Sequence, residues 1–134
     1  MVQISREAIG EMIAHAQDEA PNECCGLLIG TPGKISRVAR ARNRQASPTR
    51  YLIEPEDHFG ALRAARAVNL AVVGAYHSHP ASAAVPSETD LAEGTYPEFV
   101  YVIVSLANGR GPDVRGYRLT AGGFSNVTLV AVDP

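Results

Sequence analysis

Two histidines, a serine and an aspartate in the middle of the chain have the residue types and the spacing of a metal site. One residue separates His77 from His79, seven residues separate His79 from Ser87, and Asp90 follows three positions later. Residues i and i+2 of a strand point to the same side, so both imidazoles can reach one point at the end of a strand. Asp90, in the first turn of a following helix, can return to that point as a carboxylate ligand.

This ligand set is typical of a catalytic rather than a structural zinc. Two imidazoles and one carboxylate leave a fourth tetrahedral position open for water, whose pKa zinc lowers to about 7. Iron or cobalt would fit the same ligands. Each element also has a simpler interpretation, because Ser-x-x-Asp is a common helix N-cap and short histidine patterns arise by chance. From the spacing alone, a metal site and a chance arrangement both stay open.

The segments around the motif are those that could position it. The apolar run from Leu70 to Tyr76 predicts a central strand that ends at residues 77–80. Ser87 predicts the N-cap of a short helix. Phe99 to Leu106 predicts a second strong strand.

The remaining patterns predict two longer helices and several strands. One helix is expected over Ser5 to Ala16, and another over Pro55 to Val68, with a buried stripe of Phe59, Leu62, Ala65 and Val68. Further strands are expected at Cys24 to Ile29, Lys34 to Arg42, Tyr51 to Ile53, Val114 to Leu119 and Phe124 to Val130. About six or seven strands and three helices without a regular βαβ order predict an α/β fold with a mixed sheet.

Length and composition restrict the class of protein. The 134 residues have the size of one domain, which we expect to span residues 1–134. A hydrophobic content of 46% is typical of a soluble globular protein, and a net charge of −2 argues against nucleic-acid binding. We find no signal-peptide pattern and no apolar run long enough to span a bilayer, so we expect a cytoplasmic protein without a membrane partner.

The two cysteines and the other two histidines are expected to be structural. Cys24 and Cys25 are neighbours, whose Cα atoms lie about 3.8 Å apart, below the usual disulfide range. We expect two reduced thiols in a buried strand, inert because buried cysteines usually are. His15 and His58 fall on predicted helices and are expected at the surface.

Five arginines gather between positions 37 and 50: Arg37, Arg40, Arg42, Arg44 and Arg50. Arg40, Arg42 and Arg44 would share one face if the strand continued that far. One interpretation is a solvated edge strand that its charges protect from aggregation. The other is a docking surface for an acidic protein partner, and the sequence leaves both open.

Glu23, the His77–Pro80 run, Ser87 and Asp90 together resemble the JAMM motif of the MPN+ (Mov34-like) metallopeptidases. That motif has an upstream glutamate and H-x-H-x7-S-x2-D spacing, and every position is present here without insertion. The resemblance covers nearly the whole chain, including a Glu-x-x-Gly turn at residues 23–26. It implies the family's fold, which is a curved mixed sheet related to that of cytidine deaminases, with helices packed on it.

The resemblance also implies a role for each residue of the motif. His77, His79 and Asp90 would bind one zinc ion. Glu23 would act as the general base and pass its proton to the leaving amine. Ser87 would donate a hydrogen bond to the oxyanion, a contribution of about 3 kcal/mol.

The short chain is most similar in kind to the small stand-alone prokaryotic members that process ubiquitin-like sulfur carriers. The segment from Asn43 to Tyr51 resembles theirs as well. The implied reaction is hydrolysis of a peptide or isopeptide bond at the C-terminal tail of a ubiquitin-like protein that ends in Gly-Gly. Two alternatives are a non-catalytic MPN scaffold and a metallohydrolase that acts on a small amide. The sequence does not decide between a peptide and an isopeptide bond, or whether the protein forms a homodimer.

Overall fold

The computed structural model of the chain describes residues 1–93, 96–107 and 109–133. Three helices lie within them: α1 (Arg6–Glu19), α2 (Pro55–Ala67) and α3 (Glu88–Glu93). Eight strands lie within them as well: β1 (Val2–Ser5), β2 (Cys25–Thr31), β3 (Lys34–Ala41), β4 (Ala71–His79), β5 (Val100–Ser105), β6 (Asp113–Thr120), β7 (Gly123–Val127) and β8 (Leu129–Val132). None of the described helices is long and apolar enough to cross a membrane.

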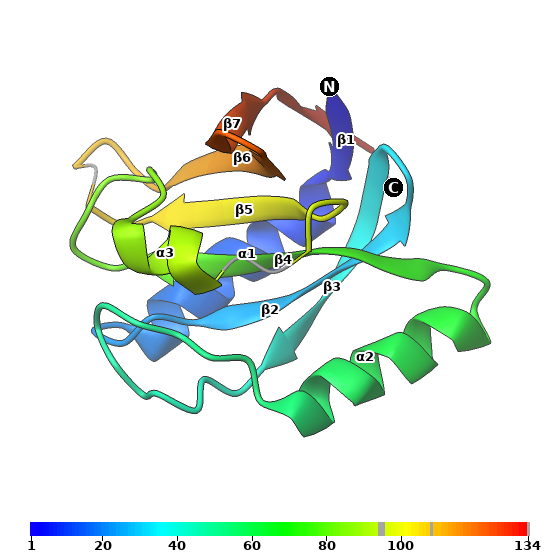
Figure 1. The fold of residues 1–134 in the computed structure, drawn as a ribbon, viewed down its shortest axis with the longest axis horizontal. Coiled ribbons are helices and arrows are strands. Elements are labelled where there is room, and N and C mark those ends of the chain that lie inside the picture. The colour runs from blue at the N-terminus through cyan, green and yellow to red at the C-terminus, as the bar shows by residue number, and fades with distance from the viewer. Residues whose placement is uncertain (94–95, 108, 134) are drawn as a thin grey trace.

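The eight strands form one mixed sheet, in the order β7-β6-β5-β4-β2-β3-β1-β8. β4 and β5 are parallel, as are the pairs that β1 makes with β3 and β8, while the other pairs are antiparallel. Thr128 alone separates β7 from β8, yet these strands end the sheet order on opposite sides. The sheet therefore curls until its two edges meet near Thr128 (Figure 1), which confirms the predicted curved, mixed sheet.

Helices cover the two faces of the sheet separately, with α1 behind it and α2 and α3 in front in the view of Figure 1. The face under α1, here called the α1 face, buries Met12 against strand residues such as Ile4, Leu28 and Val102. The opposite α2 face buries Ala61 and Ala65 of α2 against Leu27, Ile29, Ala75 and Tyr101. β4 runs between β2 and β5 and so ends near the middle of the sheet.

The helix α1 begins where the sequence predicted. Ser5 caps it, with its Oγ accepting a hydrogen bond from the Ala8 amide at 3.1 Å and donating one to the Ser36 carbonyl at 2.9 Å. The second bond fastens the helix start to β3. The predicted surface position of His15 is wrong, because His15 lies on the same stripe of α1 as Ala8 and Met12 and is buried.

The predicted buried stripe of α2 is also wrong in most positions. Phe59, Leu62 and Val68 are exposed, Phe59 by 60%, and the helix instead buries Ala61 and Ala65. These small side chains let α2 lie close to β2 and β4, so the larger ones are displaced to the margin of the helix. The extent of α2 agrees with the prediction to within one residue.

Two further predicted strands need correction, and one strand was missed. The expected strand over Tyr51 to Ile53 is a single bridge between Asn43 and Ile53. The expected strand over Phe124 to Val130 is divided at Thr128 into β7 and β8, and β1 was not predicted at all. β1 is only four residues long and runs directly into a helix cap, so its alternation is too short to detect.

Candidate active site

β4 and α3 bring three predicted ligands to one buried point on the α2 face. His77 and His79 leave the end of β4 on the same side, and their Nε2 atoms lie 3.1 Å apart. Asp90 places Oδ1 3.1 Å from Nε2 of His77 and Oδ2 3.0 Å from Nε2 of His79. All three side chains are at least 95% buried. The structure thus brings together the three residues that the spacing singled out.

A short capped helix presents Asp90. The Oγ of Ser87 accepts a hydrogen bond from the Asp90 amide at 3.0 Å, and Oδ2 of Asp90 accepts one from the Ser87 amide at 2.9 Å. This reciprocal pair fixes the first turn of α3. Ser87 itself is exposed, and its hydroxyl oxygen serves here as an acceptor, so its proton remains available to a ligand.

The loop before α3 fixes the orientation of His79. Nδ1 of His79 lies 2.8 Å from the carbonyl oxygen of Ala83. A carbonyl oxygen only accepts, so Nδ1 carries a proton, and Nε2 is the ring nitrogen that faces His77 and Asp90 and could bind a metal ion. Two other bonds hold the same loop, from Tyr117 to the carbonyl of Ala84 and from Ser105 to the carbonyl of Ser82.

The ring of Tyr51 fixes the orientation of His77. The two rings are stacked, with centroids 4.3 Å apart and planes inclined by 17°. Tyr51 lies in the segment that follows β3, and Asn43 holds this segment in place. The Oδ1 of Asn43 accepts from the amides of Gln45 and Leu52, and its Nδ2 donates to the carbonyl oxygens of Glu23 and Arg50.

Glu23 lies two residues before the start of β2, close to the end of β4. Cys25, two residues further along the chain, pairs directly with His77 of β4 in the sheet. The side chain is buried, and its Oε1 has no hydrogen-bond partner among the described residues. Burial raises the pKa of Glu23 to about 7, while His79 lowers it and Asp90 raises it. An unpaired buried carboxyl oxygen needs an explanation, and a bound water or substrate is one.

Burial and ion pairing have opposite effects on the pKa values of the three clustered residues. Burial lowers the pKa of His77. Burial alone would raise the pKa of Asp90, but hydrogen bonds from His77 and His79 outweigh it and hold that pKa well below its usual range. Burial alone would lower the pKa of His79, as it does for His77. The hydrogen bonds that His79 makes with Asp90 and with the Ala83 carbonyl outweigh this effect and raise its pKa overall. The aspartate is therefore kept ionised, as a metal ligand must be.

The cluster fits a transition-metal ion. His77, His79 and Asp90 each offer one ligand atom, and these atoms lie within 4.8 Å of one another. Two imidazole nitrogens and one carboxylate oxygen suit a tetrahedral ion with one open position. The unpaired Oε1 of Glu23 and the exposed hydroxyl of Ser87 provide polar groups beside that position.

Three positioning residues were missed by the sequence analysis: Asn43, Tyr51 and Ser78. Ser78 stands between the two histidines but faces the α1 face, where its Oγ accepts from the Cys24 amide at 2.8 Å and links β4 to β2. For Asn43 and Tyr51 the sequence offered one indication, because these two residues are the first and last of the segment that resembles the prokaryotic relatives. It offered none for Ser78.

The cysteines do not join this cluster. Both are free and buried, and burial raises the pKa of Cys24 to about 11 and that of Cys25 further. These thiols therefore stay protonated at neutral pH and are poor nucleophiles. The predicted buried, reduced pair agrees with this arrangement.

The arginine stretch does not share one face. β3 ends at Ala41, so Arg40 reaches Glu11 and Asp18 of α1, whereas Arg42 reaches Asp57 of α2. Arg44 pairs with Glu54 at 3.6 Å. These side chains thus tie β3 and the residues after it to the chain's own acidic groups.

Comparison with known proteins agrees with this geometry. The chain is 32% identical to the CysO-cysteine peptidase of Mycobacterium tuberculosis over 132 residues, which cover 97% of this chain and 90% of the relative. It is 33% identical to the desampylase of Haloferax volcanii over 109 residues, which cover 76% and 78% of the two chains. A solved structure from Desulfitobacterium hafniense superposes with a TM-score of 0.92 at 29% identity, over 100% of this chain and 94% of that one. Residues 5–120 match the family described as prokaryotic homologs of the JAB domain, and the chain therefore belongs to that family.

Proposed function

We propose that this protein is a single-domain, zinc-dependent peptidase of the JAMM type. Its substrate would be the C-terminal tail of a ubiquitin-like protein, cut at a peptide or isopeptide bond. The observation that carries the proposal is the buried convergence of His77, His79 and Asp90 beside the unpaired carboxyl oxygen of Glu23. The names of two relatives, CysO-cysteine peptidase and desampylase, support a peptidase that acts on a protein tail or conjugate.

Zinc held by His77, His79 and Asp90 would act as a Lewis acid that polarises the scissile carbonyl and lowers the pKa of water to about 7. Glu23 would hold the proton that the attacking water loses. Burial favours the protonated form of its carboxyl group, so Glu23 would take up that proton and then release it to the leaving amine.

Ser87 would stabilise the charge that develops on the carbonyl oxygen. Its hydroxyl oxygen is already occupied by the Asp90 amide at 3.0 Å, so the hydroxyl proton is directed elsewhere. A donor fixed in advance by a helix cap loses little entropy on binding the oxyanion. The same bond couples the orientation of Ser87 to that of Asp90.

A metal-dependent cleavage assay tests the proposal. The purified protein is incubated with a small ubiquitin-like carrier extended by one residue beyond Gly-Gly, and with an unrelated folded protein that bears the same last three residues. We expect cleavage of the carrier after Gly-Gly, loss of activity on chelation and recovery on adding zinc. Equal cleavage of both proteins would contradict the substrate class, and activity that survives complete metal removal would contradict the mechanism.

A further inference from the structure

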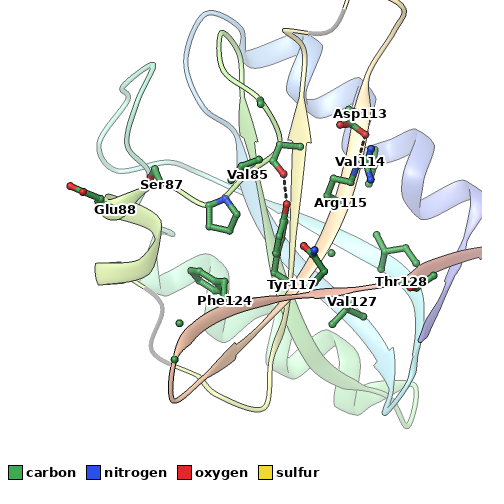
Figure 2. A pocket seen from close by; sticks show the side chains of 18 residues that line it. Val85, Ser87, Glu88, Asp113, Val114, Arg115, Tyr117, Phe124, Val127 and Thr128 are labelled. Atoms are coloured by element: carbon green, nitrogen blue, oxygen red, sulfur yellow. Dashed lines mark hydrogen bonds and ion pairs between the residues drawn. The ribbon is translucent and has the colours of Figure 1, made fainter.

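Two loops border the ligand cluster, and they are anchored differently. The loop at residues 80–87, between β4 and α3, is held from the sheet. Figure 2 shows one of its anchors, the bond from the Tyr117 hydroxyl to the Ala84 carbonyl, on the wall of a groove of about 1000 Å³. The same loop carries the Ala83 carbonyl that accepts from His79, so its anchors serve a metal ligand.

The Asn43 segment, defined as residues 43–52 between β3 and α2, is anchored to Glu23 instead. The main-chain N–H of Glu23 donates to the Ser47 carbonyl at 2.8 Å. The main-chain carbonyl of Glu23 accepts from Nδ2 of Asn43 at 3.0 Å. Because β2 begins only at Cys25, these two bonds, rather than pairing within the sheet, hold the main chain of Glu23.

The side-chain amide of Asn43 uses all four of its bonding positions. Its Oδ1 accepts from the amides of Gln45 and Leu52, each at 3.0 Å. Its Nδ2 donates to the carbonyl oxygens of Glu23 and Arg50, each at 3.0 Å. The main-chain partners fix which end of the amide is oxygen and which is nitrogen. Asn43 thus joins both ends of the Asn43 segment to Glu23.

The tip of the Asn43 segment adopts a conformation that its own residues do not favour. Ala46 has a φ of 44°, in the left-handed region that residues other than glycine rarely occupy. Its N–H donates to the main-chain carbonyl of Asn43 at 3.2 Å. Such a backbone persists only where the surrounding contacts enforce it. The segment is therefore shaped by its hydrogen bonds and not by local preference.

The position of the Glu23 carboxyl group depends on its main chain. The side chain is buried, and its Oε1 has no hydrogen-bond partner among the described residues. No bond within that part of the chain fixes this oxygen from the side, so the direction in which the main chain presents it is decisive. At its other end the Asn43 segment places the Tyr51 ring on His77, with centroids 4.3 Å apart.

We propose that Asn43 is a positioning residue, which places the Glu23 carboxyl group for proton transfer by holding the Glu23 main chain. The proposal rests on the proposed function, because it needs Glu23 to hold a proton during the reaction. Proton transfer requires heavy atoms within about 2.6–3.2 Å, and a displacement of about 1 Å can lower a rate about 10²-fold. Asn43 therefore affects the chemical step and leaves metal binding to the other loop.

The test is Asn43→Asp, which keeps the shape of the side chain and the acceptor for the Gln45 and Leu52 amides. The new carboxylate oxygen faces the carbonyl oxygens of Glu23 and Arg50 and cannot donate to them. We expect kcat on the ubiquitin-like carrier to decrease about 10- to 100-fold, with KM and zinc content unchanged. Asn43→Ser, which adds no charge, is measured beside it and should give the same pattern.

The matched control is Asn22→Asp, the same chemical change in the residue directly before Glu23. The Asn22 side chain makes none of the bonds described above, so this variant should keep the wild-type kcat. A decrease in kcat as large as that of Asn43→Asp would show that an added charge, and not a lost donor, causes the effect, and would overturn the proposal.

Amide hydrogen exchange tests the same step without measuring activity. The Glu23 amide, which donates to Ser47, should exchange faster in Asn43→Asp than in the wild type. The Ser78 amide, which donates to the Cys24 carbonyl inside the sheet, should exchange at the wild-type rate. An unchanged rate at Glu23 would mean that Asn43 does not hold its main chain, and would overturn the proposal.

A double-mutant cycle separates an effect through Glu23 from a general one. Added to Glu23→Gln, Asn43→Asp should lower kcat no further, because the group that it positions is already absent. A full additional decrease, or zinc lost from Asn43→Asp, would overturn the role of Asn43 alone. Wild-type protein that cuts no carrier would overturn the proposed function and this inference with it.

Discussion

Buried histidines occur on both faces of the sheet, in two different settings. On the α1 face, Nδ1 of His15 lies 2.7 Å from the hydroxyl oxygen of Tyr76, and both side chains are buried. On the α2 face, His77 and His79 meet Asp90 at about the same distances. Burial and hydrogen-bond length therefore do not distinguish the two settings.

The two settings differ in whether buried polar atoms are left without a hydrogen-bond partner. His15 and Tyr76 satisfy each other, and the nearest carboxylate, Glu19, is 3.9 Å away and half-exposed. His77 and His79 instead converge with Asp90 on one point, next to a buried Glu23 oxygen that has no partner among the described residues. Bonding capacity that the protein does not itself satisfy indicates a ligand site, whereas a buried polar pair indicates structure.

The largest expected effect is that of Glu23→Gln. Removing the proposed general base should lower kcat by about 10²–10⁴-fold, with metal content unchanged. The matched change beside the other histidine, Glu19→Gln, should leave kcat unaltered. If Glu23→Gln kept full activity, Glu23 would be a structural residue and the contrast between the faces would fail.

Next in size is Ser87→Ala, which removes both a helix cap and the proposed oxyanion donor. We expect a decrease in kcat of about 10²–10³-fold. Ser5→Ala removes an equivalent cap from α1, far from the ligands, and should cost about 1 kcal/mol of stability with kcat intact. Steady-state kinetics and urea unfolding of both variants check this, and similar kcat values for the two would refute the catalytic role of Ser87.

A smaller effect, confined to stability, is expected for Tyr76→Phe. The change leaves Nδ1 of His15 buried without its partner, at a cost of about 1–3 kcal/mol in the free energy of unfolding. Activity per folded molecule should stay at the wild-type value. A large decrease in kcat without loss of stability would show that the α1 face also contributes to catalysis.

The smallest effect concerns the pH dependence of stability. Burial, with Arg40, lowers the pKa of His15 below its ordinary value of 6.5, and the acidic groups Glu19, Glu11 and Asp18 oppose this only in part. The unfolded state therefore binds protons more readily, so stability is lost as the pH falls below about 6.5. Urea unfolding from about pH 7 to about pH 5 should show a shallower decline for His15→Gln than for the wild type. Equal slopes would mean that His15 does not titrate differently on folding.

The ligand cluster was predictable because its geometry is local. His77 and His79 belong to one strand, and Asp90 follows within the first turn of the next helix, so period and spacing alone bring them near one another. The position of Glu23 depends on the pairing of β2 with β4, which only the resemblance to a known family indicated. Asn43 and Tyr51 could not be assigned, because their roles depend on where an irregular segment lies.

The errors in the fold share a physical cause. Phe59 and Leu62 follow the helical period as well as Ala61 and Ala65 do, and the choice between them depends on how closely α2 approaches the sheet. His15 was misplaced because histidine is polar, although its spacing from Ala8 and Met12 matches the buried stripe of α1. In both cases tertiary packing overrode the residue's own preference.

The central claim is that His77, His79 and Asp90 hold a metal ion, and metal content tests it most directly. Elemental analysis after dialysis without chelator should find about one zinc ion per wild-type chain, as expected for a single three-ligand site. His79→Ala and Asp90→Ala should lose the metal, whereas His15→Ala should retain it. Wild-type protein that binds no metal even when zinc is supplied, or ligand variants that bind as much as the wild type, would contradict the account.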